Sequence, residues 1–242
     1  MTSTIKLGGR FGNHFIRNIC IHFIAKKNNL YIDYSYKDWI NALGIELFSG
    51  ENKYDNFTHL KTTNFFSILS SDVKSNLYLD DESYMQNKEI TKYIYDYLRK
   101  EDIKKEIIKK NMYIRKNNDV FIHVRATDAE KWNPGYEYYS KILISLQGKY
   151  ENIFISSDDF NCKVVRELMT NYKMQIFYNN EINTILFGSS NKYIILSHGS
   201  FSAIIGWFAF DSDVYYPTFY KKMFDFCGDM FTSIDTWKNI EW

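Results

Sequence analysis

The stretch that decides the fold is DVFIHVRATD, Asp119 to Asp128. Residues 120–124 form an almost continuous apolar run, which is typical of a strand covered on both faces of a parallel sheet. His123, Arg125 and Asp128 stand at its carboxyl end, where open α/β sheets bind their ligands. The stretch therefore predicts a buried strand that presents polar and charged groups to a ligand.

Strand and helix patterns alternate regularly around this stretch. We expect strands at 119–125, 152–157, 174–178, 193–197 and 213–216, and helices at 136–147, 161–172, 181–190 and 201–210. This alternation predicts a parallel sheet with covering helices. The aromatic tail, residues 217–242, is expected to pack down, back onto the first half of the chain.

The first half opens with a second strand-helix pattern. Strands are expected at Thr4–Leu7 and Leu30–Tyr34, on either side of the loop GGRFGNH (8–14) and a helix. A glycine-rich turn at a helix N-terminus favours an anion or a polar sugar. Residues 36–84 show no clear pattern, while 88–111 have helical spacing and can serve as a crossover. We therefore divide the chain into an N-terminal half, 1–112, and a C-terminal half, 113–242.

Composition narrows the class of protein. The chain has 242 residues, 45% of them apolar, and a net charge of +1, which excludes a disordered chain and argues against a nucleic-acid partner. Cys20, Cys162 and Cys227 are widely spaced and form neither a disulfide framework nor a metal-binding pair. No apolar run is long enough to span a membrane. We expect a soluble, cytoplasmic protein, and the sequence leaves its oligomeric state open.

Four polar loops carry the candidate chemistry: GGRFGNH (8–14), HVRATD (123–128), SSDD (156–159) and SHGSFS (197–202). If the two halves are facing βαβ domains, these loops can line one nucleotide-binding cleft. Arg125 is a bidentate donor suited to a diphosphate, and the alternative is an ion pair with Asp128. His123 faces the same side of the strand as Arg125 by alternation, and the alternative is a core histidine.

The remaining polar residues each have two interpretations. Ser200 and Ser202 can hold a phosphate at a helix N-terminus, or Ser200 can be an N-cap. Asp158 and Asp159 can bind a base or ribose, or can cap the next helix. The Walker and GxGxxG patterns are missing, which argues against NTPases and dinucleotide-dependent dehydrogenases. Asp211 and Asp213 precede their strand, at the wrong end of the sheet for a metal-holding pair, and no other cluster has metal-ligand spacing.

Taken together, GGRFGNH, FIHVRATD, IFISSDD and ILSHGSFSAIIGW resemble the fucosyltransferase superfamily, which includes the α-1,2- and α-1,6-fucosyltransferases and the protein O-fucosyltransferases. The layout is nearest to the α-1,2 group, family 11, and a Tyr138-Tyr139 pair and a tryptophan-containing tail add to the likeness. The resemblance implies a GT-B-like fold of two facing Rossmann-like domains. It also implies inverting, metal-independent transfer without a cofactor. The N-terminal half would contact a glycan acceptor and the C-terminal half would bind a GDP-sugar donor.

The resemblance assigns roles to matching positions. Arg125 would bind the diphosphate and stabilise the leaving group, and Asp128 would orient the arginine or its loop. Asp158 would contact the base. The other donor-binding residues would be Arg10, Gly12, His123, Ser200, Phe201 and Ser202. Asn13 matches a catalytically important asparagine, and its neighbour His14 is a candidate general base because of its ordinary pKa.

Three positions depart from the family pattern. Ala126 stands where a second arginine is common, Thr127 replaces a glycine, and His14 replaces a glutamine. We expect transfer of a 6-deoxyhexose, with L-fucose from GDP-fucose as the first candidate. The alternatives are another nucleotide sugar such as a rhamnose donor, an inactive nucleotide-sugar-binding module, and a metal-dependent transferase that uses Asp211 and Asp213.

Overall fold

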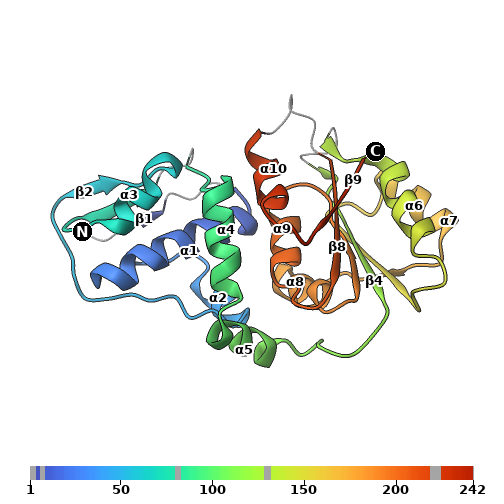
Figure 1. Cartoon of the computed structure of the whole chain (residues 1–242), viewed down its shortest axis with the longest axis horizontal. Coiled ribbons are helices and arrows are strands. Elements are labelled where there is room, and N and C mark those ends of the chain that lie inside the picture. The colour runs from blue at the N-terminus through green and yellow to red at the C-terminus, as the bar shows by residue number, and fades with distance from the viewer. Residues whose placement is uncertain (1–3, 6–8, 80–82, 128–131, 219–224, 242) are drawn as a thin grey trace. The chain divides into compact units, whose positions relative to one another are not determined.

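The computed structural model describes residues 4–5, 9–79, 83–127, 132–218 and 225–241. The chain is a mixed α/β protein that divides into two compact units, Met1–Lys110 and Asn111–Trp242. Within the described residues, each unit has one parallel sheet with its own helices (Figure 1).

The N-terminal unit is built around a short sheet in the order β1-β3-β2, with all of its strands parallel. Its elements are β1 (Thr4–Ile5), α1 (Phe11–Asn28), α2 (Lys37–Ala42), β2 (Phe57–His59), the 3₁₀ helix η1 (Thr62–Asn64), α3 (Phe65–Ser70), β3 (Asn76–Leu79), α4 (Lys88–Leu98) and α5 (Glu101–Lys110). The helical spacing of residues 88–111 is thus confirmed, as two consecutive helices. The side chain of Asn87 caps α4 by accepting a hydrogen bond from the Ile90 amide.

Helix α1 begins inside the stretch expected to be a loop. Phe11 is almost fully buried, and with Phe15 and Ile19 it continues an apolar stripe at intervals of four residues. The amides of Asn13 and His14 both donate to the Arg10 carbonyl, so they belong to the first helical turn. The prediction of a loop through residue 14 was therefore wrong at its carboxyl end.

The strand expected at Leu30–Tyr34 does not form. Leu30 makes only an isolated bridge to Asn52. Ile32 is also an isolated bridge residue, and its backbone bonds to the Ser49 side chain, whose Oγ accepts from the Ile32 amide and donates to its carbonyl. The second strand of this sheet comes later, at β2.

The C-terminal unit follows the predicted alternation closely. Its elements are β4 (Val120–Val124), α6 (Gly135–Ser145), β5 (Ile153–Ser157), α7 (Lys163–Asn171), β6 (Gln175–Ile176), α8 (Glu181–Ser189), β7 (Tyr193–Ile195), α9 (Ser200–Trp207), β8 (Asp213–Pro217), α10 (Asp225–Thr232) and β9 (Lys238–Ile240). The parallel sheet has the order β6-β5-β4-β7-β8-β9. Counted from β4 this is 3-2-1-4-5-6, the strand order of the Rossmann fold.

Helices cover both faces of this sheet, with α6 and α7 on one side and α8, α9 and α10 on the other (Figure 1). Alternate residues of β4 therefore face different helices. Val120, Ile122 and Val124 enter the core with α6 and α7, whereas Phe121 contacts Phe187 of α8. Burial on both faces explains the near-continuous apolar run of this strand.

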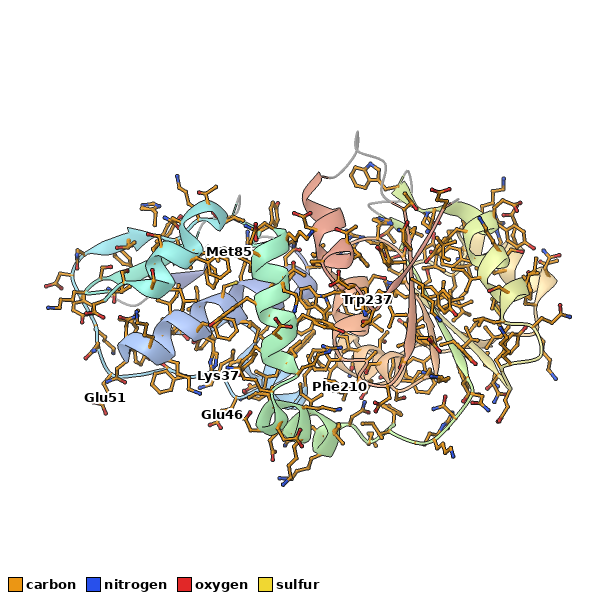
Figure 2. The ribbon with its side chains drawn as sticks, in the orientation of Figure 1. Lys37, Glu46, Glu51, Met85, Phe210 and Trp237 are labelled. Carbon is orange, nitrogen blue, oxygen red and sulfur yellow. The ribbon has the colours of Figure 1, made fainter. Side chains whose placement is uncertain are left out.

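The tail adds to the C-terminal sheet. Strand β9 pairs with β8 in parallel at the sheet edge. Trp237 is only 7% exposed and packs over Gly206 of α9, where a Cβ would collide with the indole ring (Figure 2). Met230, Phe231 and Trp237 of the tail are thus part of the core of this unit.

Among the described residues, no helix combines the length and the apolar character needed to cross a membrane. Cys20 and Cys162 are buried, and the side chain of Cys227 lies outside the described part of the chain.

Candidate functional site

The polar loops that follow β4 and β7 meet at the centre of the C-terminal sheet. Strand β4 pairs with β5 on one side and with β7 on the other. The chain therefore leaves β4 in one direction across the sheet and later returns to its other side. This is a topological switch point, where the loops separate and open α/β sheets hold their ligands.

Arg125 lies at this switch point, directly after β4. Its guanidinium packs against Gly199, the N-cap of α9, and a Cβ at Gly199 would overlap with Nη1 of Arg125. Gly199 has φ 90° and ψ 163°, a conformation that is almost restricted to glycine. The glycine thus allows a permanent positive charge to lie beside the amides that open a helix, and both favour an anion.

His123 and Ser202 form a buried hydrogen-bonded pair beneath this arginine. Ser202 Oγ accepts from the Ser197 amide at 2.9 Å and lies 2.9 Å from Nδ1 of His123. Burial lowers the pKa of His123 to about 4, although the charge of Asp158 opposes this shift and that of Arg125 adds less to it, so the ring is neutral at pH 7. This pair ties β4 to the first turn of α9. As alternation predicted, His123 and Arg125 both face α9.

Ser200, Phe201 and Ser202, the last three residues of the SHGSFS loop, all belong to the first turn of α9. The N-cap is Gly199, so Ser200 is the first helical residue and the alternative of a Ser200 cap was wrong. The Phe201 ring lies 5.3 Å from the His123 ring. The negative end of a ligand would meet the amides of this turn, since they point along the helix axis.

Two buried tyrosines hold the strand ends in place. Tyr138 Oη donates to the Leu196 carbonyl at 2.9 Å, and Tyr139 Oη lies 3.5 Å from the His123 carbonyl. Both side chains are fully buried, and burial raises their pKa values. The Tyr138-Tyr139 pair therefore supports the switch point from beneath, on the α6 side.

The loop after Arg125 is held by groups from two other segments. Asn133 Nδ2 donates to the Arg125 carbonyl at 2.8 Å. The Asp158 carboxylate accepts from the Ala126 amide at 2.7 Å and from the Thr127 hydroxyl at 2.6 Å. The Ala126 side chain is 2% exposed and lies in the core with α6. Asp128 lies outside the described residues.

The candidate residues of the N-terminal unit gather in the first turn of α1. Arg10 is the exposed N-cap, and Gly12 is buried. Gln86 Nε2 donates to Asn13 Oδ1 at 2.8 Å. A Cβ at Gly9, which has φ 82°, would collide with the side-chain Nδ2 of Asn13. Sequence reasoning missed Gln86 because 73 residues separate it from Asn13.

His14 is enclosed at the base of this turn. Its side chain is 1% exposed, and its Nδ1 lies 3.2 Å from Ser35 Oγ. The ring also contacts the Tyr36 ring at 4.9 Å. The role of His14 as a general base stays a prediction, and it would require access for the acceptor to a side chain that is now covered.

Asp213 is engaged by lysines at the amino end of β8. Its Oδ1 lies 2.8 Å from Lys238 Nζ and its Oδ2 lies 3.3 Å from Lys192 Nζ. These hydrogen bonds, led by that from Lys238, lower the pKa of Asp213. Within the described part of the chain, no group of three or more His, Cys, Asp or Glu side chains is placed to hold a metal ion.

No protein-family model matches the sequence, and no curated protein matches it. Among solved structures, the chain matches the crystal structure of POFUT1, a GDP-fucose protein O-fucosyltransferase, in complex with GDP. The two share 10% sequence identity with a TM-score of 0.49, over 88% of this chain and 96% of that chain. What the site can do has to follow from its own residues.

Proposed function

We propose that the C-terminal unit binds a nucleotide sugar by its diphosphate and that the protein is a glycosyltransferase. The observation that carries this proposal is the position of Arg125 at the Rossmann switch point, against the glycine that opens α9. A guanidinium beside the N-terminus of a helix is a combination suited to phosphate oxygens.

The same arrangement supplies the chemistry that a glycosyl transfer needs. When the bond to the sugar breaks, negative charge collects on the departing diphosphate and positive charge on the sugar ring. Arg125 and the first turn of α9 would stabilise that negative charge, and they favour the transition state because the charge is larger there than in the bound substrate. A permanent cation in this place lets the reaction proceed without a metal ion.

The proposed donor is GDP-fucose, and the proposed product is a glycan fucosylated with inversion at the sugar. The four motifs that resemble the fucosyltransferase superfamily support this choice of sugar. In the GT-B division of labour that the motifs imply, the C-terminal unit binds the donor and the N-terminal unit, with Asn13 and His14, serves the acceptor.

Calorimetric titration with GDP, GDP-fucose, UDP and dTDP, with and without EDTA, tests this proposal. We expect EDTA-insensitive binding of GDP and GDP-fucose, followed by slow release of fucose from the donor. Arg125→Ala should abolish binding while the protein stays folded. Arg166→Ala is the matched control, because Arg166 is exposed on α7.

Each other outcome removes a defined part of the proposal. Preference for UDP or dTDP would refute GDP-fucose as the donor. Binding without turnover, with every acceptor tried, would favour an inactive binding module. Normal binding by the Arg125→Ala variant would refute the site itself.

A further inference from the structure

The two aspartates that follow β5, Asp158 and Asp159, accept hydrogen bonds from two different segments of the chain. Asp159 Oδ1 accepts from the Asn161 amide at 2.8 Å, a local turn that leads into α7. Asp158 reaches in the other direction, to the loop that follows β4. The N-cap of α7 is Cys162, so the alternative in which Asp158 or Asp159 caps this helix was wrong.

Strand register explains why Asp158 can reach that loop. Strands β4 and β5 run parallel and end level with each other, with Val124 opposite Ser157. The next residues, Arg125 and Asp158, consequently leave the sheet side by side. Asp158 Oδ1 lies 2.7 Å from the Ala126 amide nitrogen and 3.4 Å from that of Thr127, and Oδ2 accepts the Thr127 hydroxyl at 2.6 Å.

These contacts restrain the backbone of Arg125 from both ends. Val124 is fixed in the sheet, the Arg125 carbonyl is held by Asn133, and the two following residues are held by Asp158. A side chain can keep its head group in one place only if its own backbone is fixed. The bonds to Asp158 are charge-assisted, which makes them stronger than hydrogen bonds between neutral groups.

We propose that Asp158 is a positioning residue, which holds the loop after Arg125 so that the guanidinium stays against Gly199 in the orientation that receives a diphosphate. This inference rests on the proposed function. It differs from the role implied by the family resemblance, in which this aspartate contacts the base.

Binding of inorganic pyrophosphate separates the two roles, since pyrophosphate has no base. Asp158→Ala should weaken the binding of pyrophosphate and of GDP by the same factor, at least tenfold. Asp158→Asn should recover most of that loss, because an amide oxygen can still accept from the Ala126 amide. Thr127→Val, which removes only the hydroxyl bond, should have a smaller effect on both ligands. A base contact would instead weaken GDP alone and leave pyrophosphate unchanged in both Asp158 variants.

A measurement without ligand keeps the inference distinct from the proposed function. NMR relaxation of the Arg125 Nε–H group, with hydrogen exchange at the 126 and 127 amides, reports on the restraint directly. We expect an ordered Arg125 side chain in the wild type and a mobile one in Asp158→Ala. An equally ordered arginine in that variant would refute the positioning role. If the wild type binds neither ligand, the proposed function fails, and the NMR comparison still decides the role of Asp158.

Discussion

Replacing Gly199 with alanine should separate the affinity for a nucleotide from the stability of the fold. The new Cβ would occupy the place of Arg125 Nη1, so the guanidinium has to move. The residue also has φ 90° and ψ 163°, and an alanine held there costs about 1–3 kcal/mol of folding free energy. Two effects are therefore expected, one on stability and one on binding.

The effect on binding follows from the hydrogen bonds that a displaced arginine would lose. A hydrogen bond to a charged group contributes about 1.5–3 kcal/mol, and about 1.4 kcal/mol corresponds to a tenfold change in affinity. Loss of one such bond between Arg125 and a diphosphate should weaken GDP binding about 10- to 100-fold. Calorimetric titration of the Gly199→Ala variant with GDP measures this change.

Gly148→Ala provides the matched control. Gly148 also has a positive φ, 76°, but nothing lies within 4 Å of a Cβ built there. This variant should lose about 1–2 kcal/mol of stability and bind GDP as tightly as the wild type. If Gly199→Ala remains folded and binds GDP within twofold of the wild type, then the position of the Arg125 guanidinium against Gly199 does not contribute to GDP binding.

Three further outcomes are expected. Ala126→Arg should lower the free energy of unfolding by at least about 3 kcal/mol in urea denaturation, because position 126 faces the core. For the same reason it should not tighten GDP binding, and a stable variant with higher GDP affinity would contradict this prediction. Burial lowers the pKa values of His22 and His123 to about 4, so the unfolded chain takes up more protons between pH 6.5 and 4. Stability should therefore fall as the pH drops through that window, by up to about 3 kcal/mol for each histidine, and a flat profile of thermal unfolding against pH would refute this. Trp237→Ala should lower the free energy of unfolding by about 3–5 kcal/mol in urea denaturation. The control Trp39→Ala, at a side chain that is 38% exposed, should cost much less, and a loss for Trp237→Ala as small as that of the control would show that Trp237 is not part of the core.

The regular elements of the C-terminal unit were predictable because each carries a local signal. A strand buried on both faces has a continuous apolar run, as in β4, and amphipathic helices repeat every three or four residues. The N-terminal unit lacks this signal over residues 36–84, where β2 and β3 have only three and four residues and α2 and α3 six each. Elements this short contain too few repeats to show a period.

The local pattern also located the polar residues at strand ends, including Arg125, Asp158 and Ser200. It could not say which of them meet, because strand order is decided by packing between segments that are distant in the chain. The sheet order places Arg125 against Gly199, 74 positions later, and parallel register places Asp158 beside Ala126. Sequence alone thus determined which residues stand at the ends of strands. Only the tertiary structure decided which side chains support one another there, and that Ala126 faces the core, since these depend on strand neighbours and side-chain direction.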